Sequence, residues 1–478
     1  MASQETIVQD VEQQLHLAMP VNATEDQALF FETFAQFITC KQHNPLMLLR
    51  GYAGTGKTTT LKAIISTLQK YNVPIVLMAP TGRAAKVMTT YTNKHASTLH
   101  RRMYKFKAIA GGQRKLTLMP NMLTNALFVV DESSMISTQL VGDQDNSLLD
   151  DLLSYVYNGT ACRVLLMGDV AQLPPVGETQ ANALDEEYIQ AIHSCTLYSA
   201  ELRQVVRQRA DSGILYNATL LRMQLMQYVY GSTLQPKFEL AGYKDIVQLE
   251  GDAIVEAVES AYSKDGIDST IIICRSNKRA YLFNQNIRVQ VLQLEDEITV
   301  GDYIMIAKNN YYWLPEDSAV DFIANGDTAR ITRIHRYMEV YGMRFCKASI
   351  ELVDYDAMGA IDVWFMLDTL AMEQPSMSSA QSTAFYNAVA EDYADEPNKA
   401  KRTALIKNNE FYNALQVKFN YAVTCHKAQG GQWQHVFIDQ GYLTQDMLTE
   451  DFAKWLYTAL TRSTHKVYLI NFNADFIA

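Results

Sequence analysis

Short, wholly apolar runs alternate with stretches of helical periodicity in the first part of the chain. Leu46–Leu49 and Ile75–Ala79 predict two buried strands, and Lys57–Lys70 between them has the spacing of an amphipathic helix. The runs "ALFVVDESS" and "CRVLLMGD" repeat the pattern, and each ends in a carboxylate. Buried strands that alternate with helices predict an α/β fold with a parallel sheet, whose ligands lie at the carboxyl ends of the strands.

A second series begins at "STIIICRSNKRAYLFNQNIR", resumes at "HVFIDQG" and ends at "KVYLINF". Between these segments the pattern changes. Residues 297–350 carry short β-rich runs separated by turn residues such as Asn325-Gly326-Asp327, which predicts a small inserted β-barrel. Residues 370–412 are polar and helix-prone, and their composition fits either a mobile arm or extra helices.

Composition narrows the class of protein. An apolar fraction of 48% with 19% charged residues is typical of a globular chain that buries several cores. Six cysteines stand singly, without a CxxC pair, which argues against a disulfide framework and favours a reducing cytoplasm. The polar N-terminus does not resemble a secretion signal, and no apolar run approaches the roughly 20 residues that span a bilayer. The net charge of −11 is unusual for a nucleic-acid-binding protein, but a basic groove can lie on an acidic body.

The segment Gly51–Thr58 matches the phosphate-binding pattern G-x-x-x-x-G-K-[ST] between a predicted strand and a predicted helix. Glycines allow the backbone amides to point at phosphate oxygens, and the helix N-terminus adds partial positive charge. Lys57 would reach the β- and γ-phosphates, and Thr58 would bind Mg²⁺. The predicted nucleotide-binding residues here are Gly51, Tyr52, Ala53, Gly54, Thr55, Gly56, Lys57, Thr58 and Thr59.

Asp131 and Glu132 directly follow an apolar strand. Beside a phosphate-binding loop, an Asp in this place holds Mg²⁺ and a neighbouring Glu polarises the attacking water. Two acids after a strand are otherwise a solvated turn. The combination therefore predicts hydrolysis of a nucleoside triphosphate, with Thr58 and Asp131 as metal ligands.

Eight segments carry a family resemblance. "GYAGTGKTTT", "APTGRAAK", "ASTLHR", "VVDESSM", "GDVAQLPPVG", "LRQVVRQ", "YAVTCHKAQG" and "WLYTALTRS" occur in this order. Together they resemble the motif series of superfamily 1B helicases, the RecD-like and Dda-like branch. The resemblance implies two RecA-like P-loop domains with parallel sheets, a β-hairpin pin and an SH3-like β-barrel insertion. It also implies ATP-dependent 5′-to-3′ movement along single-stranded DNA.

The domain boundaries that follow are 1–195 for the first motor domain, with a pin at about 102–126, and 196–296 for the first part of the second. The barrel with its helical arm would take 297–415, and the second motor domain would resume at 416–478.

The resemblance also assigns residues around the nucleotide. Gln27 in "TEDQALFF" would contact adenine, and Gln172 would sense the γ-phosphate. Arg207 and Arg462 would be arginine fingers from the second domain, so that hydrolysis requires closure of the cleft. Lys427, Gln429 and Gly430 would face the same cleft.

Other motif positions would face DNA. Hydroxyls, amides and basic side chains in loops at strand ends bind phosphates without reading sequence. The segment "HRRMYKFKAIAGGQRKLTL" predicts a hairpin at the position of the pin, although an ordinary surface hairpin fits the same residues. The SH3-like barrel would contact DNA or brace this pin. The predicted DNA-binding residues are Pro80, Thr81, Gly82, Arg83, Thr98, His100, Tyr104, Phe106, Pro174, Thr424 and His426.

The adjacent Cys425 and His426 suggest a thiol nucleophile with its base, or two metal ligands. Neighbouring residues on a strand point to opposite faces, and no further ligands lie nearby in the sequence, so we expect neither. Cys425 is predicted to be a packing residue.

The function predicted from these motifs is an ATP- and Mg²⁺-dependent DNA helicase. It would act in the cytoplasm as a monomeric motor on single strands and duplex junctions, with repair, recombination or replication partners. A P-loop ATPase switch that clamps DNA, an RNA helicase and the motor subunit of a nuclease complex are the alternatives.

Overall fold

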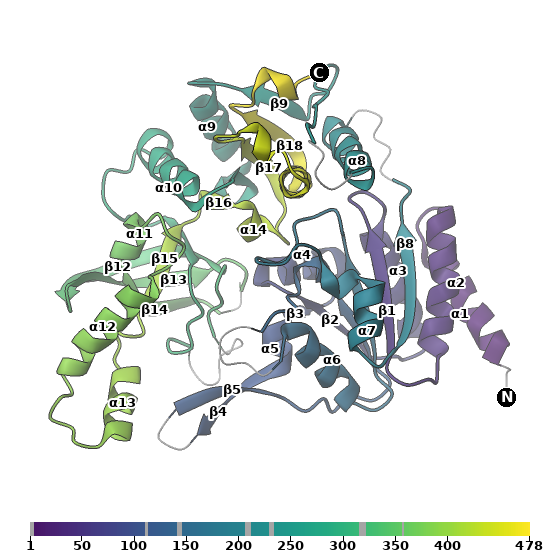
Figure 1. Ribbon diagram of the computed structural model, residues 1–478, viewed down its shortest axis with the longest axis horizontal. Helices are drawn as coiled ribbons and strands as arrows, with labels where there is room; N and C mark the ends of the chain where they lie inside the picture. Colours follow the sequence, from purple (N-terminus) through teal and green to yellow (C-terminus); the bar gives the residue numbers. More distant parts are fainter. Residues whose placement is uncertain are drawn as a thin grey trace.

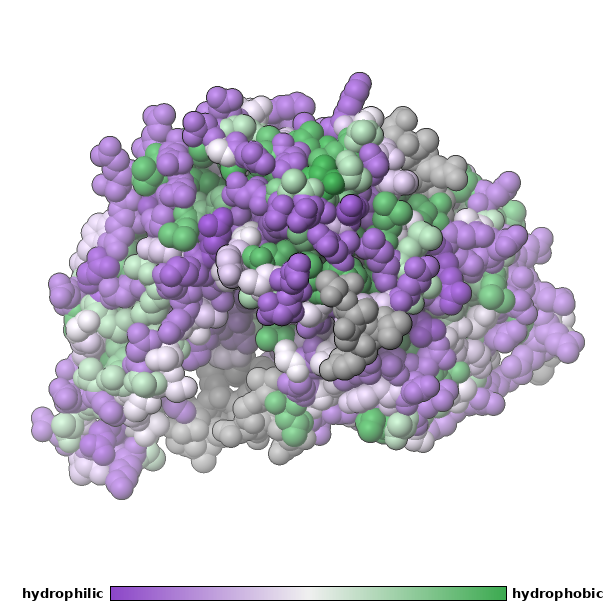
Figure 2. Space-filling view, turned by 45° about the horizontal axis from the view of Figure 1, so that its top comes forward, coloured by the Kyte–Doolittle hydropathy of each residue, from purple (hydrophilic) through white to green (hydrophobic). Residues whose placement is uncertain are grey.

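The structure, a computed structural model, describes residues 4–109, 113–140, 146–205, 212–228, 234–314, 322–355 and 358–478, without the side chains of 106–116. Two α/β domains lie one above the other in Figure 1, and a barrel with two helices stands beside them. Figure 2 shows a mostly hydrophilic surface on which hydrophobic residues form separate small groups. In the part of the chain that is described, no helix combines the length and the apolar character that crossing a bilayer requires.

The first motor domain is built on one six-stranded parallel sheet, as the sequence predicts. Its strands, in spatial order, are β3 (Ala96–Thr98), β2 (Ile75–Ala79), β6 (Leu127–Val130), β7 (Arg163–Gly168), β1 (Pro45–Gly51) and β8 (Thr196–Leu202). Its helices are α1 (Gln4–Ala18), α2 (Glu25–Thr39), α3 (Lys57–Lys70), α4 (Gly82–Thr92), α5 (Leu99–Met103), α6 (Leu148–Asn158) and α7 (Glu186–Ile192). Because all six strands are parallel, their carboxyl ends meet along one edge, where ligands bind.

One predicted boundary is wrong. Strand β8 pairs with β1 in parallel over its full length, from Thr196 against Pro45 to Leu202 against Gly51. The first motor domain therefore extends through Leu202 and does not end at residue 195.

The second motor domain has a five-stranded parallel sheet. Its strands, in spatial order, are β16 (Ala422–Thr424), β10 (Thr270–Cys274), β17 (Trp433–Asp439), β18 (Ser463–Ile470) and β9 (Ile246–Leu249). The helices are α8 (Gly213–Met226), α9 (Ala253–Asp265), α10 (Asn277–Asn286) with a π-helical continuation (Ile287–Val291), α14 (Cys425–Ala428) and α15 (Glu450–Leu460). Short 3₁₀ turns span Ser133–Met135, Asn182–Leu184, Ile267–Ser269, Gln445–Met447 and Ala474–Phe476.

The insertion is a closed five-stranded barrel, as predicted. Its strands are β11 (Tyr303–Ile306), β12 (Thr328–Val340), β13 (Met343–Leu352), β14 (Ala360–Met366) and β15 (Leu415–Phe419). The last strand ends at Phe419, so the predicted boundary at residue 415 falls too early.

Residues 370–412, which the composition left open, contain helices that pack on the barrel. They include α12 (Ser379–Glu391) and α13 (Lys399–Lys407), which follow the short helix α11 (Asp368–Ala371). Phe385 of α12 and Ile406 of α13 are buried with Phe345 and Trp364 of the barrel in one apolar cluster. The segment thus adds helices to the insertion.

The predicted hairpin is present in the first motor domain. Strands β4 (Tyr104–Ile109) and β5 (Gln113–Leu118) pair antiparallel, from Tyr104 against Leu118 to Ile109 against Gln113. In Figure 1 this hairpin projects from the first motor domain and lies below the barrel.

Candidate active site

The phosphate-binding loop joins β1 to α3. Gly54 and Gly56 have φ angles of +79° and +88°, a backbone region that favours glycine. Gly56 is the N-cap of α3 and provides no side-chain cap, so the first amides of the helix remain available to an anion. The Lys57 ammonium donates to the carbonyl oxygens of Tyr52, at 3.1 Å, and Gly51. A Cβ on Gly51 would lie 2.9 Å from Cγ of Lys57, so the glycine makes room for the lysine stem.

A cleft of about 1300 Å³ opens over this loop and is shared by both motor domains. It is larger than the range of about 300–1,000 Å³ that is typical of small-molecule pockets, and many of its walls are polar or charged. Of the predicted residues, it is lined by Tyr52, Ala53, Gly54, Gly56, Lys57, Thr58, Thr59, Asp131, Glu132, Gln172, Gly430 and Arg462. The structure thus brings together residues as far apart in the sequence as Tyr52 and Arg462.

The carboxylate pair lies at the end of β6. Asp131 Oδ2 accepts a hydrogen bond of 2.6 Å from the Tyr91 hydroxyl, and Oδ1 accepts one of 2.8 Å from the Glu132 amide. Burial raises the pKa of Asp131 above its ordinary range. Glu132 has a left-handed φ of +53°, which is uncommon for a residue with a side chain and occurs at strained functional positions.

Arg462 approaches this pair from the second motor domain. Its Nη1 lies 3.3 Å from Oε1 of Glu132, and its Nε donates to the carbonyl oxygen of Thr458 at 3.1 Å. The guanidinium is therefore held beside the Glu132 carboxylate, and its role as an arginine finger stays a prediction. Arg207, the other predicted finger, lies outside the described residues.

Gln172 lies in the loop that follows β7 and is 5% exposed at the cleft wall. Its Oε1 is buried and has no hydrogen-bond partner within the described residues. A buried amide left partly unpaired at the wall of a cleft is suited to a polar ligand. The site as a whole fits a metal-bound triphosphate. The Gln172 amide, the uncapped amides of α3 and the Lys57 ammonium suit the phosphates, and the Thr58 hydroxyl and the Asp131 carboxylate suit the metal ion.

Some predicted nucleotide residues lie elsewhere. Gln27 is 1% exposed behind the loop, where its Nε2 donates to the Thr55 carbonyl oxygen at 3.3 Å. Its Oε1 accepts from the amide of Thr24 in a capping box at the start of α2. Gly51 and Thr55 likewise lie beneath the surface of the loop. A contact between Gln27 and adenine stays a prediction.

The stretch Tyr421–Gly430 corrects one expectation. Cys425 and His426 lie on the short helix α14, so the argument from a strand is wrong. Cys425 is nevertheless a packing residue: it is 1% exposed, its Sγ lies 3.6 Å from the Trp455 carbonyl oxygen, and burial raises its pKa to about 12. A protonated, enclosed thiol is a poor nucleophile.

Lys427 does not face the nucleotide cleft. Its ammonium donates to Oδ1 of Asn325 at 2.6 Å, toward the barrel. Gln429 is buried between the motor domains, where its Nε2 donates to the Leu173 carbonyl oxygen at 2.6 Å. Gly430 alone of the three lines the cleft. The prediction for Lys427 is wrong because its ammonium binds Asn325, and it does not line the nucleotide cleft.

The predicted DNA residues at the strand ends have local partners. Thr81 and Thr98 cap α4 and α5 by accepting from the amides of Ala84 and Arg101, at 3.2 Å each. The Arg83 guanidinium lies 4.2 Å from the centre of the Trp433 ring, and burial lowers its pKa. Arg83 therefore stacks across the gap between the motor domains.

The other residues predicted to contact DNA differ in exposure. Tyr104 is buried and its hydroxyl donates to Oδ2 of Asp151 at 2.6 Å, so it is not an exposed pin aromatic. His100 packs against the rings of Tyr104 and Phe322, at 5.6 and 6.3 Å. Pro174 is buried, Pro80 and Thr424 are partly exposed, Gly82 is buried beneath Tyr355, and the side chain of Phe106 lies outside the described part. His426 is partly exposed, and burial lowers its pKa.

The sequence did not single out three side chains that contact the site. Tyr91 binds Asp131, and Tyr457 and Thr458 of α15 reach the first motor domain. Tyr457 and Thr458 belong to the quoted segment "WLYTALTRS", but only the fold reveals their partners.

Comparison with known proteins agrees with this geometry. Residues 35–178 match a family model described as an AAA domain, and residues 419–470 match the UvrD-like helicase C-terminal domain. An uncharacterized protein of Acanthamoeba polyphaga mimivirus is 23% identical over 92% of this chain and 98% of its own.

Two named helicases are also similar. The ATP-dependent RecD2 DNA helicase of Deinococcus radiodurans is 39% identical over 27% of this chain, and the ATP-dependent DNA helicase dda of Enterobacteria phage T4 is 26% identical over 59%. The matched parts span 16% and 60% of those two proteins. The two family models fall on the two motor domains, and both helicases belong to the branch that the ordered motifs resemble. These similarities support the resemblance to superfamily 1B helicases, in their RecD-like and Dda-like branch, that the ordered motifs carry.

Proposed function

We propose that the chain is a DNA helicase that hydrolyses ATP, moves 5′ to 3′ along a single strand and separates duplex DNA. The observation that carries this proposal is the placement of Arg462 of the second motor domain 3.3 Å from Glu132 of the first, over the phosphate-binding loop. A charge supplied across a cleft makes hydrolysis depend on closure of the two domains, which is what a stepping motor requires.

The residues of the cleft have complementary tasks in hydrolysis. Lys57 exchanges its bonds to the loop carbonyls for the β- and γ-phosphates, and the first amides of α3 bind the phosphate oxygens. Glu132 orients and polarises the attacking water. Arg462 stabilises the charge that develops on the transferred phosphoryl group, and Gln172 contacts the γ-phosphate. Thr58 and Asp131 would hold Mg²⁺, which neutralises phosphate charge; Tyr91 keeps Asp131 oriented.

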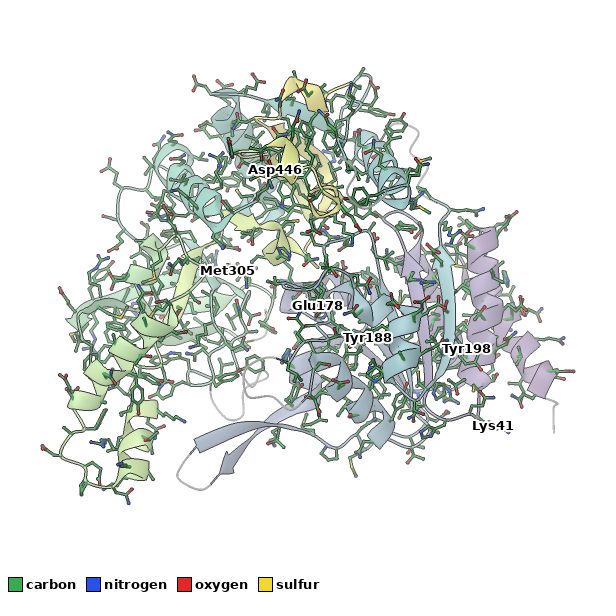
Figure 3. All side chains as sticks on the ribbon, in the orientation of Figure 1. Lys41, Glu178, Tyr188, Tyr198, Met305 and Asp446 are labelled. Carbon is green, nitrogen blue, oxygen red and sulfur yellow. The ribbon has the colours of Figure 1, made fainter. Side chains whose placement is uncertain are left out.

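The strand would run along the carboxyl edges of the two sheets. Pro80–Gly82 follow β2 in the first motor domain, and Thr424 ends β16 in the second. Figure 3 places Met305 of the barrel and Glu178 of the first motor domain below α14, and Asp446, in the loop after β17, above it. We expect the DNA path to adjoin α14, which directly follows Thr424; beyond the end of this helix, Gly430 lines the nucleotide cleft. The hairpin β4–β5 would meet the duplex. Repair, recombination or replication proteins would be the partners of the whole protein.

Two linked assays test the proposal. Lys57→Ala and Glu132→Gln are each expected to lower DNA-stimulated ATP hydrolysis at least 100-fold, because each removes a group that acts on the phosphates or the water, typically worth about 10²–10⁴-fold. Lys62→Ala is the matched control, since Lys62 is exposed on the same helix. Chelation of Mg²⁺ should abolish turnover in all variants.

Unwinding is measured on paired duplexes with 5′ or 3′ single-stranded tails, with DNA and RNA strands of matched sequence. We expect faster strand release from 5′-tailed DNA. Turnover of ATP without strand release would favour a clamping switch, and a preference for 3′ tails would contradict the proposed direction. If RNA strands stimulate ATP hydrolysis more strongly than DNA strands, the substrate is RNA and the proposal of a DNA helicase is wrong.

A further inference from the structure

Tyr457 of helix α15 crosses from the second motor domain into the first. Its hydroxyl donates to Oδ2 of Asp169 at 2.6 Å and accepts from the amide of Ala53 at 2.9 Å. The side chain is fully enclosed, at 1% exposure. Ala53 lies in the phosphate-binding loop, and Asp169 directly follows β7, so one hydroxyl joins both elements to α15.

The neighbouring residue holds the same segment at a second point. Oγ1 of Thr458 accepts from the amide of Leu173 at 2.8 Å, while the carbonyl oxygen of Leu173 accepts from Gln429. The segment from Asp169 to Leu173 carries Gln172, which lines the cleft. Helix α15 therefore grips both ends of this segment.

Arg462 follows α15 closely and is tied to it. Its Nε donates to the carbonyl oxygen of Thr458, one turn back. Arg462 is the second residue after the end of α15 at Leu460. The guanidinium is fixed to the helix. The position of α15 on the first motor domain therefore determines the distance between Arg462 and Glu132.

We propose that Tyr457 is a positioning residue for hydrolysis: its hydroxyl docks α15 on Ala53 and Asp169 and thereby places Arg462 against Glu132. This inference rests on the proposed function. A hydrogen bond from a buried hydroxyl to a carboxylate is stronger than a neutral one, and its loss leaves a buried acceptor with one donor fewer. The ring itself belongs to an apolar cluster with residues of both motor domains, and phenylalanine would preserve this packing.

The chain offers a closely matched control. Tyr421 is also 1% exposed, its hydroxyl donates to Oδ1 of Asp302 at 2.7 Å, and it accepts from the amide of Tyr303 at 3.2 Å. Its partners lie at the junction with the barrel and do not line the nucleotide cleft. Tyr457→Phe and Tyr421→Phe thus remove the same two bonds from different places.

The test is a double-mutant cycle with Tyr457→Phe, Arg462→Ala and the combined variant, measured as ATP turnover at saturating single-stranded DNA. Tyr457→Phe is expected to lower kcat by about 10- to 100-fold, the range of a hydrogen bond to a charged group, with little change in the affinity for a fluorescent ATP analogue. In the Arg462→Ala background the same change should cost less than about 2-fold, because the side chain it positions is absent. Tyr421→Phe should lower Tm without a comparable change in kcat.

Two results would overturn the inference: equal losses from Tyr457→Phe with and without Arg462, or equal losses of kcat from the two tyrosine variants. If the unmodified protein binds the ATP analogue without hydrolysing it, the proposed function fails. The contact of α15 with Ala53 and Asp169 is then tested by the rise in Tm that the ATP analogue causes. Tyr457→Phe must reduce this rise more than Tyr421→Phe does.

Discussion

Gly430 lies where the second motor domain touches the first, and Gly430→Ala should act on their contact more than on the fold. Its φ is +73°, and a Cβ there would lie 2.7 Å from Cβ of Ala84 and 3.1 Å from Oγ1 of Thr81. Both neighbours belong to the start of α4 in the first motor domain. The added methyl group would therefore push α14 and α4 apart.

The cost has two parts that fall on different states. The left-handed backbone costs an L-residue about 1–2 kcal/mol, whether the domains are together or apart. Ordinary carbon contacts are about 3.5–4.0 Å, so a separation of 2.7 Å is overpacked, which costs about 1–3 kcal/mol. Only this second part opposes closure. It corresponds to about a 5- to 150-fold loss of the closed arrangement.

The control is Gly342→Ala. Gly342 has a similar φ of +68° and nothing within 4 Å of the added Cβ, so it carries the backbone cost alone. Both variants should show a comparable fall in Tm, whereas only Gly430→Ala should lose DNA-stimulated ATP turnover by the factor above. Turnover by Gly430→Ala within about 2-fold of Gly342→Ala would refute the reasoning, since an overpacked contact of this size cannot be neutral.

Three further outcomes are expected. Asp302→Asn should lower stability by about 3–5 kcal/mol in denaturant unfolding, because Asp302 and Arg288 form a buried pair with two contacts of 3.0 Å; an effect below about 1 kcal/mol would contradict this. Burial raises the pKa of Asp327 from 3.8 to about 7, so its contribution to stability is present below the lower value and lost as pH rises through the upper one; Tm measured near pH 5 and pH 8 should fall more in the unmodified protein than in Asp327→Asn. His426→Ala should weaken the DNA stimulation of ATP hydrolysis more than the basal rate, and equal losses would give His426 a purely structural role.

The sequence predicted what local patterns encode. The helix Lys57–Lys70 and the strand Ile75–Ala79 begin and end where the sequence indicates, because the fold buries one apolar face of the helix and most of the strand. Gly54 and Gly56 are recognisable since a phosphate-binding loop needs their backbone angles. The phosphate-binding loop, Asp131 and Glu132 followed from motifs at the ends of predicted strands, whereas Gln172, Gly430 and Arg462 followed from the family resemblance.

What the sequence left out depends on contacts between distant segments. Lys427 binds Asn325, which is 102 positions away. The local sequence around Lys427 does not indicate such a distant partner. Tyr104 resembles an exposed pin aromatic until the fold places Asp151 beside it. Tyr457 resembles a core residue of an amphipathic helix, and its acceptor, Asp169, is 288 positions earlier.

The connection between the barrel and the nucleotide cleft has a mechanical consequence. Strand β15 of the barrel ends at Phe419, and after two residues the same backbone enters β16 and then α14. Asn284 clamps this crossing by accepting from the amides of Tyr421 and Ala422, at 2.9 and 2.8 Å. The barrel and the nucleotide cleft are thus joined by one short run of backbone that is fixed at Asn284 and reaches the cleft wall at Gly430. A displacement of the barrel relative to α10 would act first on these two hydrogen bonds.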